Sequence, residues 1–217
     1  MDKFPISIGG RPQNRALSIA LNIILFVLVL VIVLELTFFS RFRRFYVVGR
    51  SMYPTLVGAE YTQSGAIDSS GDYVYADRFA SPERGDIVII TTDNGDGGSI
   101  TIIKRVIAFA GESVELVRGV LYINGEETAE PYVSPEFNTP SLAKNTYERT
   151  VVPDGCIFVL GDNRDYSVDS RGHYGMIDID DVEGVVAEWS LSVRWLVNPF
   201  SRFFDFTLPN VFSGCSN

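Results

Sequence analysis

The chain has 217 residues, of which 46% are hydrophobic and 21% charged, a balance typical of a folded protein rather than a disordered or fibrous one. Two cysteines and one histidine are too few for a zinc ribbon or a multi-histidine centre, so the sequence predicts no metal site and no cofactor. Residues 1–44 carry a net charge of +4 and the rest of the chain −13, an acidic body that argues against a nucleic-acid partner.

An apolar run near the N-terminus is long enough to cross a lipid bilayer. No charge occurs from Ala16 to Leu34, and a helix over residues 16–39 is about 36 Å long. A cleaved signal peptide is the alternative, but its apolar stretch is usually about 7–15 residues long and ends in small residues. Here aromatic and basic residues follow the run, as beside a retained anchor. We therefore expect a tail at residues 1–15, a transmembrane helix at 16–39 and a second domain at 40–217.

The charges around this run do not set its orientation. Three basic residues precede the run and four follow it, up to Arg50. The positive-inside rule therefore gives almost no bias.

The rest of the chain is predicted to be mainly β. Short stretches rich in Val, Ile and Tyr are separated by Gly, Pro, Asp and Asn, as strands are by turns. These stretches are residues 73–75, 87–90, 100–108, 113–117, 120–123, 156–160 and 182–189. Asn124-Gly125 indicates a hairpin turn.

Ser51 follows the apolar run closely, in the stretch Gly-Arg-Ser-Met-Tyr-Pro-Thr-Leu. Pro54 restricts its own φ and keeps Tyr53 out of the helical region, so the serine lies on a stiff, non-helical segment. By itself, a serine before a proline is most often a simple turn residue.

Lys104 lies in a predicted strand, Ile-Thr-Ile-Ile-Lys-Arg-Val-Ile. Alternation places Lys104 on one face with Ile102 and Val106 and turns Arg105 to the other, so one of the two cations faces apolar neighbours. Burial lowers the pKa of an amine, and a fall from about 10.4 to about 8 costs about 3 kcal/mol. The neutral amine is then a base for a serine hydroxyl. A lysine at a strand edge that reaches water is the alternative.

A dense polar run, residues 161–171, follows the apolar residues 157–160. It cannot continue a buried strand, so we expect a loop whose polar groups bond one another. Ser167 offers a hydroxyl that can hold an amine, and Asp169 is expected to pair with Arg171. A solvated acidic turn is the alternative.

In this order behind a membrane helix, the three stretches resemble bacterial type I signal peptidases, the membrane-anchored serine proteases that remove signal peptides from exported proteins. The resemblance runs from about Tyr46 to Val186 and includes Gly85-Asp86-Ile87-Val88 and Gly111-Glu112. It implies a mainly β fold, in which a single N-terminal transmembrane helix is followed by an antiparallel β-sheet catalytic domain. It also implies a small inserted cap around residues 116–150.

The resemblance assigns roles to five residues. It implies that Ser51 is the nucleophile and Lys104 the general base of a serine endopeptidase that works through an acyl-enzyme. Ser167 matches the serine that orients the lysine amine, and Asp169 and Arg171 match supporting positions.

The sequence departs from the family pattern at three places. The backbone N–H of Ser51 is expected in the oxyanion hole, but Gly49 stands where some members have a second donor, a serine. Residues 57–70 are expected to form an inserted loop. Glu112 replaces a common aspartate on what should be a structural turn.

The resemblance also implies the substrate. It is an extended preprotein segment laid along a strand edge, with small residues at the first and third positions before the cut. The residues that the motifs place at its pockets are Val47, Met52, Leu56, Ile102 and Ile103. The implied partners are preproteins and the lipid bilayer, and the implied location is the cell membrane, with the N-terminus cytoplasmic and the catalytic domain outside.

Two features stay open at this point. The aromatic segment 198–212 either dips into the membrane interface or covers the β core. Cys156 either forms a disulfide with Cys215 or is simply buried in an apolar strand.

Two other functions compete with the protease. One is a catalytically silent, membrane-anchored binding module of the same fold, which is disfavoured because Ser51, Lys104 and Ser167 are all present. The other is a Ser-Lys autoprotease of the repressor-cleaving type. Those proteins are cytosolic, and the apolar run argues against that reading.

Overall fold

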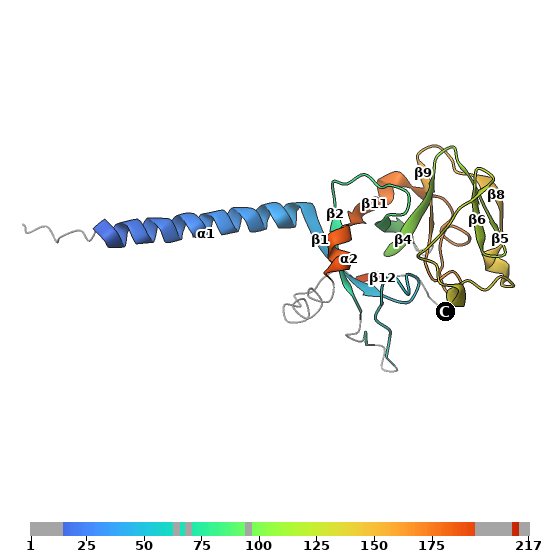
Figure 1. The fold of residues 1–217 in the computed structure, drawn as a ribbon, viewed down its shortest axis with the longest axis horizontal. Coiled ribbons are helices and arrows are strands. Elements are labelled where there is room, and N and C mark those ends of the chain that lie inside the picture. The colour runs from blue at the N-terminus through green and yellow to red at the C-terminus, as the bar shows by residue number, and fades with distance from the viewer. Residues whose placement is uncertain (1–14, 63–65, 68–70, 94–96, 194–209, 213–217) are drawn as a thin grey trace, which may run out of the picture. The chain divides into compact units, whose positions relative to one another are not determined.

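The computed structural model describes residues 15–62, 66–67, 71–93, 97–193 and the backbone of 210–212. The chain divides into two compact units, residues 1–41 and 42–217 (Figure 1).

The first unit contains one helix, α1, over Arg15–Arg41. It has 27 residues, an 18-residue window within it reaches a mean hydropathy of 3.2, and none of its side chains is buried within the protein. By length and composition α1 can cross a membrane, and it fits a membrane anchor. The expected span, residues 16–39, lies within it.

The second unit is built on an eight-stranded sheet in the order β10-β9-β4-β12-β1-β2-β11-β3. β3 also pairs with β4, so the sheet closes on itself. Its pairs are antiparallel except for those of β12, which runs parallel to both β1 and β4. The strands are β1 (Phe42–Val48), β2 (Tyr73–Asp77), β3 (Ile87–Asp93), β4 (Ser99–Phe109), β9 (Cys156–Leu160), β10 (Ile177–Asp178), β11 (Val182–Val186) and β12 (Asn210–Phe212).

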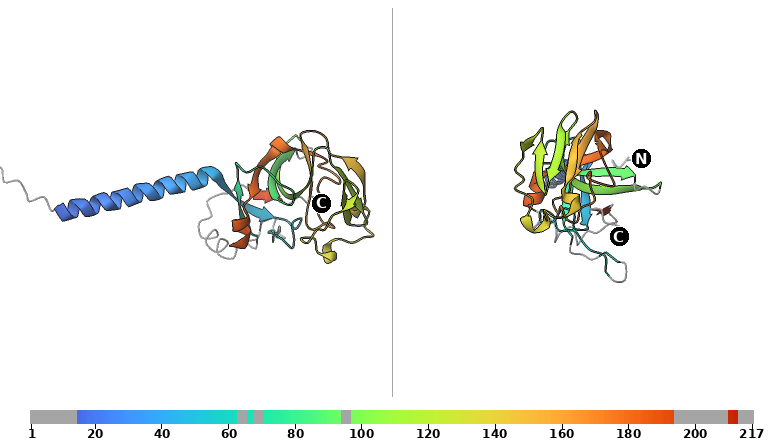
Figure 2. Two further views of the ribbon diagram at one scale, coloured as in Figure 1. Left: turned by 45° about the horizontal axis from the view of Figure 1, so that its top comes forward. Right: turned by 90° about the vertical axis from the view of Figure 1, so that its right-hand side faces the viewer.

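A second, four-stranded sheet has the order β7-β6-β5-β8. Its strands are β5 (Ser113–Val117), β6 (Val120–Ile123), β7 (Glu126–Glu127) and β8 (Tyr147–Val151). It lies at the end of the unit opposite β1 (Figures 1 and 2). Asn124 and Gly125 join β6 to β7 with φ of 55° and 84°, as expected for the hairpin turn. The 116–150 region, expected as a cap, runs from β5 into β8.

The mainly β fold with an N-terminal apolar helix is as predicted, and each of the seven expected stretches contains a strand. The prediction for residues 182–189 was wrong at its end. β11 stops at Val186, and a short helix, α2 (Glu188–Ser192), follows it. α2 forms because Trp189 turns back to pack on Phe42 and Tyr75, with ring centroids 5.6 and 5.3 Å away.

The remaining short helices are 3-10 turns: η1 (Pro135–Phe137), η2 (Ala143–Asn145) and η3 (Ile179–Asp181).

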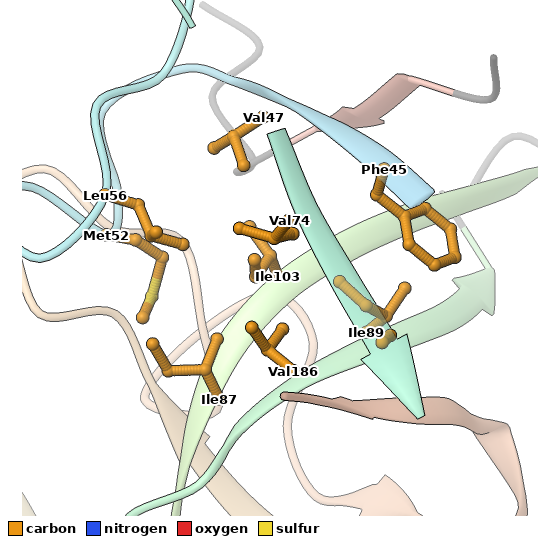
Figure 3. Packing of buried hydrophobic residues seen from close by; sticks show 10 residues of the cluster. Phe45, Val47, Met52, Leu56, Val74, Ile87, Ile89, Ile103 and Val186 are labelled. Atoms are coloured by element: carbon orange, nitrogen blue, oxygen red, sulfur yellow. The ribbon is translucent and has the colours of Figure 1, made fainter. Parts of the chain in front are cut away.

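Because the large sheet closes, both faces of its central strands are buried. On β3, Ile87 and Ile89 join one apolar cluster, whereas Val88 and Ile90 join another. This is why the strand reads as an unbroken apolar run rather than an alternating one. Met52 and Leu56, which lie beyond β1, enter the first cluster and anchor the turn between them (Figure 3).

The structure bears only partly on the C-terminal segment and the cysteines. Asn210–Phe212 forms β12, while residues 198–209 lie outside the described part. Cys156 is half-buried on β9, and Cys215 also lies outside the described part.

Candidate active site

Ser51 lies on a turn held at both ends. β1 ends at Val48, and the turn is closed by hydrogen bonds from Gly49 N to Ala59 O (2.7 Å) and from Ala59 N to Val47 O (2.9 Å). A Cβ on Gly58 would lie 1.7 Å from the carbonyl oxygen of Gly49, so only glycine allows this closure. Ser51 itself is fully buried. The nucleophile candidate is thus fixed by the backbone.

Lys104 reaches this turn from β4. Its Nζ lies 2.9 Å from Ser51 Oγ and donates a hydrogen bond to the Ile103 carbonyl, also at 2.9 Å. Both side chains are 0% exposed. The structure therefore brings together the two residues that the sequence singled out, although they are 53 positions apart.

Ser167 lies beside this pair without joining it. Its Oγ is buried and has no hydrogen-bond partner among the described residues, so the predicted bond to the Lys104 amine is not present. Its position is nevertheless defined by Gly161, where a Cβ would lie 2.3 Å from Ser167 Oγ and 2.5 Å from Ser51 O. Residue 161 must be glycine because Ser167 and the Ser51 carbonyl both press against it.

Asp169 and Arg171 form the predicted ion pair, with Arg171 Nε 2.8 Å from Asp169 Oδ1 and Nη2 2.9 Å from Oδ2. Asp169 also accepts a hydrogen bond from Gly161 N at 3.1 Å. Burial alone would raise the pKa of Asp169, but the charge and hydrogen bonds of Arg171 outweigh it and hold the pKa below its ordinary value. The pair fixes the loop that carries Gly161 and Ser167.

A second buried ion pair was missed from the sequence. Arg105, next to Lys104, donates to Asp162 through Nε (2.8 Å) and Nη2 (2.6 Å) and to the Gly85 carbonyl through Nη1 (2.6 Å). Its guanidinium lies 4.0 Å from the centre of the Tyr132 ring. Strand alternation correctly predicted that Arg105 faces away from Lys104. It could not identify Asp162 as the partner, because Asp162 lies on a loop that is distant in the sequence.

A further ion pair, between Arg164 and Glu130, connects the segment before η1 to the loop at residues 161–171. This pair was also missed from the sequence. Arg164 is fully buried and forms two hydrogen bonds with Glu130. Desolvation and the neighbouring Glu130 carboxylate, which accepts a hydrogen bond from the Tyr132 hydroxyl, raise the pKa of Tyr132. A Glu followed two residues later by a Tyr gives no signal of such a contact in the sequence.

A cleft of about 380 Å³ adjoins the Ser51 turn. Asn163 links the two, because its N–H donates to Ser51 O at 2.9 Å and the residue is one of those that line the cleft. The Asn163 Oδ1 is buried without a hydrogen-bond partner in the described part of the chain. The cleft is lined by Arg50, Tyr53, Val57, Gly58, Glu60, Phe137 and Asn163.

Four of the five predicted pocket residues lie together. Val47, Met52, Leu56 and Ile103 belong to one apolar cluster, and each is fully buried (Figure 3). Ile102 packs instead with the cluster around Val88 and Ile90, because successive residues of β4 face opposite sides. Only the first four share a cluster, and none of the five is among the residues that line the cleft.

Within the described ranges, no three His, Cys, Asp or Glu side chains come together as a metal site.

Comparison with known proteins identifies related chains. A family model described as signal peptidase, peptidase S26, matches residues 18–190. Signal peptidase I of Bacillus amyloliquefaciens is 41% identical over 140 residues, covering 63% of this chain and 67% of its own length. Signal peptidase I T of Bacillus subtilis is 38% identical over 149 residues, covering 66% and 70%.

A crystal structure of a signal peptidase I from Enterococcus faecalis is 34% identical, covers 50% of this chain and 98% of its own, and has a TM-score of 0.40. On the match of the family model to most of its length, the chain belongs to the signal peptidase family, peptidase S26.

Proposed function

We propose that the chain is a type I signal peptidase, a membrane-anchored serine endopeptidase that removes signal peptides from exported preproteins after small residues. The observation that carries the proposal is the 2.9 Å separation between Lys104 Nζ and Ser51 Oγ, both fully buried. Complete burial favours the neutral form of an amine, which is the form able to accept the hydroxyl proton.

In the proposed reaction, Ser51 Oγ attacks the carbonyl carbon before the cut while Lys104 takes the hydroxyl proton. The tetrahedral intermediate collapses as Lys104 returns that proton to the leaving amine, which leaves the signal peptide esterified to Ser51. Water then attacks the ester carbonyl while Lys104 takes a proton from it. As the bond to Ser51 Oγ breaks, Lys104 returns that proton to Oγ, which regenerates Ser51 and releases the signal peptide with a free C-terminal carboxyl group. The backbone N–H of Ser51 is proposed as one donor to the oxyanion.

Ser167 is proposed as a positioning residue rather than a catalytic one. We propose that its buried hydroxyl holds the Lys104 amine once Ser51 Oγ is bonded to the substrate. Asp169 and Arg171 are proposed to keep the Ser167 loop rigid. Val47, Met52, Leu56 and Ile103, which are fully buried, are proposed to pack beneath the surface that receives small side chains and so to shape it.

The proposed topology puts the N-terminus in the cytoplasm and the catalytic unit outside, where preproteins emerge from the bilayer. α1 supports the anchor by its length and apolar composition. In a chain whose Cys156 and Cys215 are replaced by serine, single cysteines introduced at residue 3 and at exposed residue 141 are labelled with a membrane-impermeant reagent to test the orientation, and only the second should react in intact cells.

The test of function is cleavage of a preprotein by the purified full chain in detergent, scored by the new N-terminus of the product. Ser51→Ala and Lys104→Ala should each abolish the cut. Ser141→Ala is a matched control, because Ser141 is exposed, and it should cleave as the unaltered chain does. Full activity in either dyad variant would refute the proposed mechanism.

A further inference from the structure

In the large sheet, two strands are connected to each other through a strand from the C-terminal segment. β12 lies between β1 and β4, which do not pair with each other. On β1, residues 46–48 pair with Asn210–Phe212, and on β4 Ile102 pairs with Phe212. Without β12, two strand edges would face each other across a gap one strand wide, about 10 Å. Such a gap binds an extended peptide from both sides.

This strand position leads to the proposed dyad. β1 runs on from Val48 to Ser51, and Lys104 belongs to β4, two residues after Ile102. β12 is parallel to both strands, so it points toward the Ser51–Lys104 pair rather than away from it. Any peptide bound in this direction presents the bonds just beyond the position of Phe212 to the dyad.

The sequence of the tail also matches the substrate class. Val211 and Phe212 are followed by Ser213 and Gly214, two small residues. Counted back from Ser213, the third position is Val211, a compact apolar residue. The tail thus carries the kind of sequence that a site selective for small side chains accepts.

We propose that the C-terminal segment is a self-ligand that occupies the substrate's strand position and competes with preproteins. The predicted competition with preproteins rests on the proposed function, whereas the pairing of β12 with β1 and β4 does not. Because the segment is tethered, its effective concentration at the site is high, in the millimolar range for a short linker (~1 mM). A preprotein must displace it, so the tail raises KM and leaves kcat unchanged.

The experiment compares the full chain with a chain that ends at Pro209, both in detergent, on one peptide substrate. Removal of the tail should lower KM by about tenfold with kcat unchanged, because a competitor affects only binding. In the full-length chain, Val211→Pro removes a ladder N–H and should act like the truncation. Val211→Thr keeps the strand and should behave as the unaltered chain. Equal KM values for the full and truncated chains would overturn the proposal.

A synthetic peptide of residues 205–217 provides the second arm. It should inhibit the truncated chain competitively, and the same peptide with proline at position 211 should not. If neither the full nor the truncated chain cleaves any substrate, the proposed function fails. Fluorescence anisotropy of the labelled peptide with the truncated chain still shows whether the C-terminal segment binds. Binding supports the self-ligand, and its absence at millimolar peptide contradicts it.

Discussion

Arg105 and Asp162 form a buried, two-pronged ion pair immediately beside the Ser51–Lys104 pair, with N–O distances of 2.8 and 2.6 Å. Lys104 and Arg105 are consecutive on β4 and point to opposite faces. Holding the Arg105 guanidinium therefore holds the backbone from which the Lys104 amine extends. The ion pair connects the polar loop after β9 to the strand that carries the proposed base.

The first prediction concerns this pair. Asp162→Asn leaves the Arg105 charge buried without its counter-charge, and we expect the free energy of unfolding to fall by about 3 kcal/mol. Chemical denaturation of the detergent-solubilised chain measures it. Glu60→Gln breaks the exposed pair with Arg50 and should cost less than about 1 kcal/mol. Equal losses from the two variants would mean that burial does not strengthen the Arg105 contact.

The second prediction concerns Gly161. Gly161→Ala places a methyl group 2.3 Å from Ser167 Oγ and 2.5 Å from Ser51 O, so the turn that holds the nucleophile must shift. We expect kcat/KM to fall by more than about 100-fold, since small displacements at a reacting centre cost that much. Gly172→Ala is the matched control, because its Cβ meets nothing within 4 Å and activity should be retained. Normal activity in Gly161→Ala would show that the turn tolerates movement.

The third prediction is the dependence of activity on pH. If Lys104 acts as the base, only its neutral form is active, so log kcat/KM should rise by about one for each pH unit and then level off. Circular dichroism across the same range controls for unfolding. A rate that is flat or falls as pH increases through the alkaline range is incompatible with an amine base.

The fourth prediction concerns Asp169 and stability. Its pKa is lower in the folded chain than in the unfolded one, so the folded state binds this proton less readily. The stabilisation is therefore complete above the unfolded pKa of about 3.9 and is lost as the pH falls through the lower, folded value. Asp169→Asn should cost about 3 kcal/mol at pH 7 by breaking a buried pair.

Unfolding free energies at pH 7 and at pH 3 measure this difference. The gap between Asp169→Asn and the unaltered chain should narrow at the lower pH. Asp154→Asn, at an exposed carboxylate, should change stability little at either pH. A gap that widens at low pH would give the Asp169 shift the opposite sign.

Much of the fold was predictable because its signals are local. Apolar stretches bounded by turn residues located the main strands, and Asn124-Gly125 located a hairpin. β1 was not predicted, because its basic and aromatic residues read as an interfacial anchor after α1. β12 was not predicted either, since three residues carry no period, and its pairing with β1 and β4 depends on the closed sheet.

The candidate site shows the same division. Ser51 and Lys104 were found because each lies in a recognisable segment, and Asp169 and Arg171 because they are two residues apart. Arg105–Asp162 and Arg164–Glu130 were missed, since each joins segments that only the tertiary fold brings together. The expected bond from Ser167 to the amine is absent among the described residues, where Lys104 Nζ instead meets Ser51 Oγ and a backbone carbonyl.

The closure of the turn around Ser51 also has a consequence for engineering. Gly49 and Ala59 bond each other, and Val57 is tied to Asp72 both through its carbonyl, which accepts from Asp72 N, and through its N–H, which donates to the Asp72 carboxylate. These hydrogen bonds hold the residues on both sides of the segment between Glu60 and Ser70. An affinity tag or a reporter domain inserted into that segment should therefore leave the position of Ser51 unchanged.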